Sequence, residues 1–181
     1  MINRIIVCGG NGAGKSTLGR ELANKINFEF RDIEDYYFSA NNTSYNYETA
    51  RTKEEVSSLL LEDIQRHDNF LLASVKGNYG TEISSLFTCA VFVTVPKDVR
   101  MKRVKDRSYK KFGHRMLAGG DLYEKEKSFF DMVENRSEED VEEWLQSLDI
   151  PVIKVDGRLA VDVNIEKIKE FIKKKMIKTM D

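Results

Sequence analysis

One segment near the N-terminus, residues 9–16, constrains the fold of this chain more than any other. It reads Gly-Gly-Asn-Gly-Ala-Gly-Lys-Ser, and it follows an apolar run at residues 4–8 that predicts a strand. Behind it, Leu18, Leu22 and Ile26 recur at helical spacing and predict a helix. A strand, the spacing G-x-x-x-x-G-K-S and a helix, in that order, indicate a phosphate-binding loop.

The chemistry of such a loop needs these residue types. Glycines allow positive φ angles and close backbone approach, so successive N–H groups can point at phosphate oxygens near a helix N-terminus. Lys15 supplies a charge for the β- and γ-phosphates, and the Ser16 hydroxyl is a ligand for Mg²⁺. We therefore expect ATP and Mg²⁺ as cofactors, although the motif itself does not separate ATP from GTP. The predicted nucleotide-binding residues are Gly10, Asn11, Gly12, Ala13, Gly14, Lys15, Ser16 and Thr17.

Strand patterns alternate with helical patterns along the rest of the chain. This alternation predicts a parallel sheet in one domain, which suits a chain of 181 residues. Thr52 with Glu55, and Asp121 with Glu124, have capping-box spacing and predict two helix starts. The acidic stretch at 134–143 predicts a solvated helix face without chemistry. The predicted strands cover residues 4–8, 28–32, 70–74, 90–95 and 152–155.

The overall charge gives no reason to expect a nucleic-acid or membrane partner. The chain has 29 Lys+Arg and 30 Asp+Glu, which gives a formal net charge of -1. Its apolar runs are far shorter than the roughly 18 residues of a membrane span. Cys8 and Cys89 both lie in strand-like runs, where a free thiol packs as a small apolar group. We therefore expect a cytoplasmic protein without a disulfide framework.

The loop at 9–17, the short chain and a basic segment late in it resemble the P-loop kinases of small molecules. These include nucleoside monophosphate kinases and shikimate and gluconate kinases. The resemblance implies a three-layer α/β/α P-loop NTPase fold with about five parallel strands in the order 2-3-1-4-5. It also implies ATP on the loop, an acceptor near the ends of strands two and three, and a small lid. We place the single domain at residues 1–181 and the lid insertion at about residues 107–122.

Two carboxylates follow the predicted second strand. Asp32 ends this strand and Asp35 lies three residues further on, at the edge of the sheet where parallel α/β folds place ligands. In the resembling kinases an Asp here orients and deprotonates the acceptor hydroxyl or holds Mg²⁺. We therefore assign Asp35 to the acceptor, and Asp32 to the metal together with Ser16. The alternative is that Asp35 caps or solvates a loop.

Further candidate contacts for the acceptor lie at residues 36–51 and after the predicted third strand. Arg51 occupies the region where monophosphate kinases place an arginine on the acceptor's phosphate, although it could equally be a surface residue. The aromatic and amide-rich run at 36–47 suits a pocket lining or a wet loop. After strand three the chain reads Lys76-Gly77-Asn78, where monophosphate kinases usually carry Asp-Gly, and no Walker-B aspartate is visible. Asn78 is a candidate acceptor contact, and the alternative is a plain turn.

A basic segment follows the predicted fourth strand, between residues 100 and 115. On a helix Arg103 and Arg107 are i, i+4 neighbours on one face, so both can point at one anion. The resembling kinases use such arginines on the transferring phosphate, which makes Arg103 and Arg107 catalytic candidates beside Lys15 and Asp35. A competing interpretation is nucleic-acid binding, because aromatic residues are interleaved with the basic ones.

These features predict an ATP-dependent phosphotransferase that moves the γ-phosphoryl group to a nucleotide, nucleoside or hydroxylated metabolite. The alternative is a nucleotide-binding switch or ATPase that acts through a macromolecular partner. The missing Walker-B aspartate favours this alternative slightly. The sequence leaves open the identity of the acceptor and the oligomeric state.

Overall fold

Five parallel strands form one sheet in the computed structural model, which describes residues 2–38 and 50–178. Their order across the sheet is β2-β3-β1-β4-β5, and every adjacent pair is parallel. The order expected from the resemblance is confirmed, and each strand end lies within one residue of its expected position. The strands are β1 (Asn3–Cys8), β2 (Glu29–Asp32), β3 (Asn69–Ala73), β4 (Cys89–Thr94) and β5 (Val152–Asp156).

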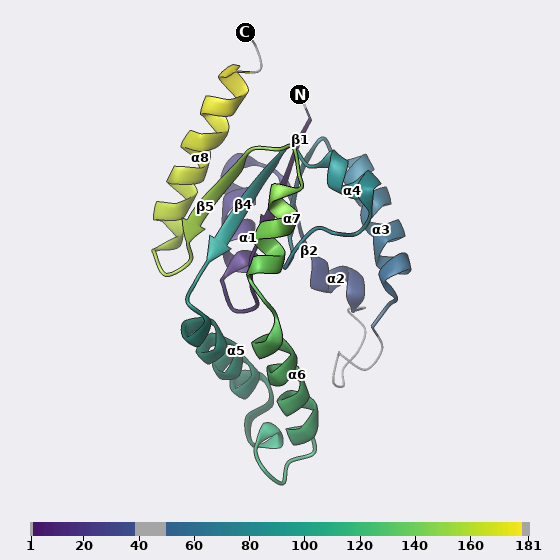
Figure 1. Cartoon of the computed structure of the whole chain (residues 1–181), viewed down its shortest axis with the longest axis vertical. Helices are drawn as coiled ribbons and strands as arrows, with labels where there is room; N and C mark the ends of the chain where they lie inside the picture. The colour runs from purple at the N-terminus through teal and green to yellow at the C-terminus, as the bar shows by residue number, and fades with distance from the viewer. Residues whose placement is uncertain (1, 39–49, 179–181) are drawn as a thin grey trace.

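Helices cover both faces of the sheet and make three layers (Figure 1). On one face, α3, α4 and α7 pack their apolar residues against a core that contains Ile6. On the other face, α1 and α8 pack against a core that contains Ile5 and Val7. Successive side chains of a strand point to opposite faces, so β1 contributes to both cores in turn. The helices of these layers are α1 (Lys15–Ile26), α3 (Lys53–Arg66), α4 (Thr81–Leu86), α7 (Glu139–Gln146) and α8 (Val161–Lys178).

One of the two predicted capping boxes is confirmed. The Thr52 hydroxyl accepts a hydrogen bond from the Glu55 backbone N–H at 3.2 Å, and the Glu55 carboxylate accepts one from the Thr52 N–H at 2.8 Å. The box predicted at Asp121 is wrong, because α6 (Tyr123–Asn135) begins without a capping side chain. The Asp121 carboxylate instead accepts two-pronged hydrogen bonds from Arg115, with Nη2 at 2.6 Å. The guanidinium group therefore competes with the helix N-terminus for this carboxylate.

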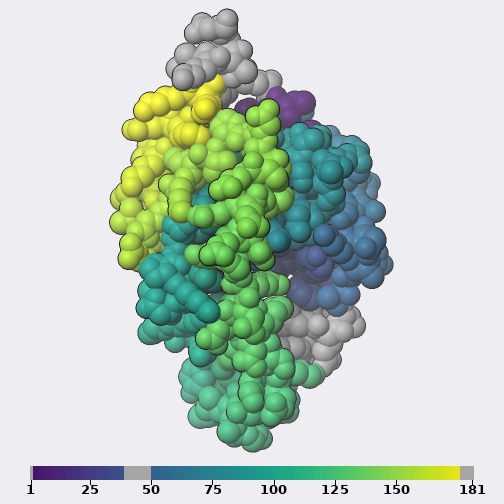
Figure 2. Space-filling view, in the orientation of Figure 1, coloured from purple at the N-terminus to yellow at the C-terminus, as the bar shows by residue number. Residues whose placement is uncertain are grey.

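The basic segment forms the first helix of a hairpin beyond the carboxyl ends of the strands (Figure 1). Here α5 (Lys97–Phe112) leads through the 3₁₀ helix η1 (Gly113–Met116) to α6. The two long helices share a small core of Met101, Val104 and Val133. Figure 2 shows the hairpin as the tapered end of the molecule, far from the start of β1. Within the described residues, no helix combines the length and apolar character needed to cross a bilayer.

Candidate functional site

The glycine-rich loop at residues 9–16 joins β1 to α1 at the carboxyl end of the sheet (Figure 1). Gly12 and Gly14 have φ angles of 81° and 96°, in the left-handed region that glycine adopts without strain. A Cβ atom on Gly12 would also lie 2.5 Å from the carbonyl oxygen of Arg100. Behind the loop, Leu18 and Leu22 are buried against the sheet and fix the start of α1. The path of the loop therefore depends on glycine at both positions.

Lys15 occupies the first position of α1 and is partly buried. Its ammonium group donates a hydrogen bond to the carbonyl oxygen of Gly10 at 3.0 Å. Burial lowers the pKa of Lys15 to about 8, and the negative charges of Asp32 and Glu34 oppose this shift. These charges do not offset the burial of the ammonium group, and phosphate oxygens would add further negative charge beside it.

A cavity of about 470 Å³ opens beside the loop. Arg103 and Arg107 of α5 both line it, so the structure brings the two predicted arginines to the loop. The guanidinium group of Arg103 donates hydrogen bonds to the carbonyl oxygens of Gly157 at 3.1 Å and Gly12 at 3.4 Å. The predicted nucleotide-binding residues that line this cavity are Gly12, Ala13, Gly14, Lys15, Ser16 and Thr17.

The loop after β5 supplies another wall of the same cavity. Hydrogen bonds from the side chain and backbone of Arg158 lower the pKa of Asp156 to about 2. The buried Asn164 donates from Nδ2 to the carbonyl oxygen of Asp156 at 2.8 Å. A Cβ atom on Gly157 would lie 2.4 Å from the carbonyl oxygen of Ala13. The two loops are therefore held in close contact through their backbones.

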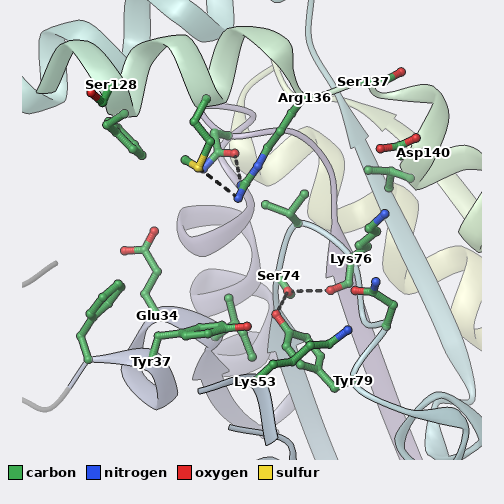
Figure 3. Close-up of a pocket in the computed structure, with 18 of the residues that line it drawn as sticks. Glu34, Tyr37, Lys53, Ser74, Lys76, Tyr79, Ser128, Arg136, Ser137 and Asp140 are labelled. Carbon is green, nitrogen blue, oxygen red and sulfur yellow. Dashed lines mark hydrogen bonds between the residues drawn. The ribbon is translucent and has the colours of Figure 1, made fainter. Parts of the chain in front are cut away.

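A second, larger cavity of about 910 Å³ includes Asn11 of the glycine-rich loop in its lining (Figure 3). Its other walls come from α2 (Ile33–Tyr37), the start of α3, the loop after β3, and α6 with α7. Aromatic rings and charged side chains share these walls. The lining contains Ile33, Glu34, Tyr37, Phe38, Lys53, Ser74, Val75, Lys76, Asn78, Tyr79, Lys125, Ser128, Phe129, Met132, Arg136, Ser137, Asp140 and Val141.

The two carboxylates predicted after β2, Asp32 and Asp35, line neither of these cavities. Asp32 accepts a hydrogen bond from the Glu34 backbone N–H at 3.1 Å and caps α2, while its charge acts on Lys15. Asp35 is exposed and does not line the larger cavity, whereas Glu34 does. Both residues are exposed on α2, between the buried Ile33 and Tyr36. Glu34, and not Asp35, therefore borders the larger cavity.

Of the other two predicted acceptor contacts, one lines the larger cavity and the other does not. Asn78 lines the larger cavity. Arg51 does not line it, because its guanidinium group donates to the carbonyl oxygen of Tyr36 at 2.7 Å and its backbone N–H donates to Tyr37. Arg51 therefore supports the end of α2. Of the aromatic and amide-rich run at 36–47, residues 39–47 lie outside the described residues.

Sequence reasoning missed Arg136, which follows α6 and lines the larger cavity. Its Nη1 donates to the side-chain oxygen of Asn11 at 2.9 Å, so a cation from the acidic stretch reaches the glycine-rich loop. Asp140, from the same stretch, also lines this cavity. The predicted solvated face is confirmed, because most of residues 134–143 are exposed while Val141 is buried in the core. The available signal was that Arg136 is the only cation in that stretch.

Arg100 of α5 is a second residue that sequence reasoning did not single out. It is 3% exposed, and its guanidinium group donates to the carbonyl oxygens of Val95 at 3.1 Å and Asn11 at 3.3 Å. It also forms an ion pair with Glu138 at 2.9 Å. A Cβ atom on Gly10 would lie 2.5 Å from Arg100 Nη1. This buried cation therefore holds the glycine-rich loop through the Asn11 carbonyl oxygen and connects it to Glu138 at the start of α7.

The donors near the loop fit a magnesium ion that is held mainly by phosphate and water. Ser16 lines the smaller cavity, and the charge of Asp32 reaches Lys15 at the same place. Within residues 2–38 and 50–178, no group of three or more His, Cys, Asp or Glu side chains forms a metal cage. Mg²⁺ needs no such cage, because it commonly uses one or two protein ligands together with substrate phosphates.

Comparison with known proteins places this site in a family. A family model described as an AAA domain matches residues 5–143. An uncharacterized protein, YqaC of Bacillus subtilis (strain 168), is 27% identical over 180 residues, which covers 95% of this chain and 98% of YqaC.

Solved structures of small-molecule kinases have the same fold. A shikimate kinase from Acinetobacter baumannii, in complex with shikimate, matches with a TM-score of 0.62 and 15% identity, over 97% of this chain and 95% of that chain. A sugar kinase from Janibacter sp. HTCC2649 matches with a TM-score of 0.59 and 18% identity, over 96% and 95%. Deoxyadenosine kinase from M. mycoides with bound dATP matches with a TM-score of 0.58 and 17% identity, over 96% and 100%. The resemblance to P-loop small-molecule kinases is confirmed at the level of the fold.

We predict that triphosphate binding depends on pH through Lys15. Above a pH of about 8 the free ammonium group loses its proton, whereas bound phosphate favours the charged form, so binding takes up a proton. The affinity for ATP should fall by up to about tenfold per pH unit above that value. Titration calorimetry near pH 8.5 in two buffers of different ionisation enthalpy measures the uptake. Lys15→Met is the control, and equal heats for the unaltered protein in both buffers would contradict the shift.

We also predict that Arg100→Lys weakens both the fold and the loop. A lysine cannot reproduce the hydrogen bonds of Arg100 to two carbonyl oxygens together with its ion pair. The free energy of unfolding should fall by about 2 kcal/mol, with weaker triphosphate binding. Urea denaturation and calorimetry measure these two effects. Arg66→Lys, at an exposed i, i+4 ion pair with Glu62, should change neither, and equal effects of the two changes would count against this role.

Proposed function

The chain belongs to the AAA-domain family, and from that premise we propose that it is an ATP-dependent kinase of a small-molecule acceptor. One observation carries the proposal: two cavities adjoin one glycine-rich loop. The smaller cavity is lined by the loop's helix start and three arginines, which suits a triphosphate. The larger one is lined by both aromatic and charged side chains, which suits a second small molecule. A simple ATPase has no need of this second cavity.

The geometry supports a different role in the transfer step for each group of residues around the loop. The N–H groups of the loop and the start of α1 would hold the triphosphate, and Lys15 would reach its β- and γ-phosphates. Arg107 lines the same cavity and would stabilise charge on the transferring phosphoryl group. The acceptor oxygen would form a bond to the γ-phosphorus, while the bond to the β–γ bridging oxygen breaks and ADP leaves.

Ser16 and Asp32 would hold the magnesium ion. When bound, this ion neutralises charge on the β- and γ-phosphate oxygens. Asp32 already caps α2 through one carboxylate oxygen, which fixes the orientation of the group. Asp32 thus stands in for the acidic residue missing at the end of β3, where Ser74 donates its hydroxyl to the Lys76 carbonyl oxygen.

We place the lid at residues 107–122 within a single domain of 1–181. This segment contains the end of α5, η1 and the turn into α6, at the tapered end of the molecule (Figure 2). Closure of this segment over the loop would exclude water that otherwise competes with the acceptor for the γ-phosphoryl group. The fixed part of α5, which carries Arg100 and Arg103, would act as the base of the lid.

A second candidate function is a nucleotide-dependent switch or ATPase that acts through a macromolecular partner. The observation that favours it is the absence of an acidic side chain at the end of β3, where Ser74 follows Ala73. A switch needs nucleotide binding and slow hydrolysis but no phosphorylated product. A kinase must consume ATP faster when its acceptor is present.

The test is therefore a search for product. We expect that incubation with Mg-ATP and pools of nucleoside monophosphates, nucleosides, sugar acids and hydroxylated metabolites yields one mass shifted by a phosphoryl group. Lys15→Ala should abolish that product and leave the circular dichroism spectrum unchanged, because Lys15 lies at the loop and not in either apolar core. Binding of ATP without product from any pool would replace the kinase proposal with the switch.

Arg107→Ala and Arg103→Ala should behave differently in the same assay. Arg107 lines the cavity, and within the described residues it makes no hydrogen bond to the loop, so its loss should lower kcat by about 100-fold with little change in ATP affinity. Arg103 holds the Gly12 and Gly157 carbonyl oxygens, so its loss should weaken ATP binding as well. Lys102→Ala, at an exposed ion pair on the same helix, is the control. Equal losses in kcat and affinity for Arg107→Ala would make it a ground-state contact.

A further inference from the structure

The charges around the larger cavity indicate the charge of its ligand. Four cations line it, namely Lys53, Lys76, Lys125 and Arg136, against the two carboxylates of Glu34 and Asp140. Within the described part of the chain, the ammonium groups of Lys53 and Lys76 form no ion pair. The two charges of Lys53 and Lys76 match the charge of a phosphate monoester, which is about -1.5 to -2 at pH 7. The cavity therefore suits a phosphorylated ligand better than a neutral one.

The aromatic side chains indicate a flat ring in the same ligand. Tyr37, Phe38, Tyr79 and Phe129 all line the cavity, and the rings of Tyr37 and Tyr79 lie 6.4 Å apart with a 57° tilt. In Figure 3 these two tyrosines lie on the opposite side of the cavity from Arg136. Every nucleobase has a π-face that stacks on such rings. An aliphatic sugar acid would leave this part of the wall without a partner.

The size of the cavity agrees with a ligand that has both parts. About 910 Å³ lies near the upper end of the usual range for small-molecule sites. Arg136 is hydrogen-bonded to Asn11 of the glycine-rich loop, so this cation of the cavity adjoins the triphosphate site. A ligand with its phosphate near Arg136 and its base near Tyr37 would span the cavity and present the phosphate to the reaction.

We infer that the acceptor is a nucleoside 5′-monophosphate, an inference that rests on the proposed kinase function. A non-bridging oxygen of its phosphate forms the new bond to the γ-phosphorus of ATP. The bond between the γ-phosphorus and the β–γ bridging oxygen breaks, so the products are ADP and a nucleoside diphosphate. The attacking oxygen is already anionic at neutral pH, so no base is needed. The exposed position of Asp35, away from this cavity, is consistent with such an acceptor.

The experiment compares acceptors that carry the phosphate, the ring, both or neither. With Mg-ATP held constant, we would measure ADP release and product mass for the ribo- and deoxynucleoside monophosphates, the matching nucleosides, ribose 5-phosphate, and cyclic hydroxy acids. At least one nucleoside monophosphate should be converted, with kcat/KM at least about 100-fold above its nucleoside and above ribose 5-phosphate. Conversion of a nucleoside or hydroxy acid but of no monophosphate would overturn the acceptor class and leave the kinase proposal standing. If none of these compounds is converted, both the acceptor class and the kinase proposal are contradicted.

Variants then test the cavity itself. The double change Lys53→Met and Lys76→Met should raise KM for the monophosphate at least about tenfold, with KM for ATP unchanged. Lys127→Met, an exposed lysine of α6 that does not line the cavity, should change neither value and serves as the matched control. The fluorescence of Trp144, which lies next to Gly77 beside the Lys76 loop, reports binding without turnover. A KM for the monophosphate that is unaffected by the double change would place the acceptor phosphate elsewhere and overturn the assignment.

Discussion

The site depends on one buried cation beneath the glycine-rich loop. The Arg100 guanidinium group lies between the loop, the end of β4 and the start of α7, where it binds the carbonyl oxygens of Asn11 and Val95 and the carboxylate of Glu138. A side chain at Gly10 would collide with it. Removal of a buried charge from water is costly unless its hydrogen bonds are made, so these contacts hold the loop in one shape.

Helix α5 extends the effect of this cation to the chemistry. Arg100, Arg103 and Arg107 lie at i, i+3 and i+7, so they share one face of the helix. The first is buried below the loop, the second holds the backbone of two loops, and the third lines the smaller cavity. Because the three arginines belong to one helix, the ion pair that fixes Arg100 also fixes the position of Arg107 in the smaller cavity. The same helix then continues into the hairpin that we assign to the lid.

Cations line both cavities of a chain that is close to neutral overall. The formal net charge is -1, yet Lys15, Arg103 and Arg107 line the smaller cavity, and cations outnumber carboxylates in the larger one. Burial lowers the pKa of Lys15 to about 8, even though the charges of Asp32 and Glu34 oppose this shift. Anionic ligands would add further negative charge beside it. Arg136, bonded to Asn11, links the two cavities through the loop.

Sequence alone determined the features that depend on local spacing. The glycine-rich loop, the strand positions, the Thr52 cap and the shared face of Arg103 and Arg107 follow from periods of two and 3.6 residues and from motif spacing. Only the tertiary structure decided which polar side chains face a cavity. Glu34 borders the larger cavity while its exposed neighbour Asp35 does not, and Arg136 reached a loop 125 residues earlier in the chain. Such contacts are set by packing between distant elements, and no local pattern encodes them.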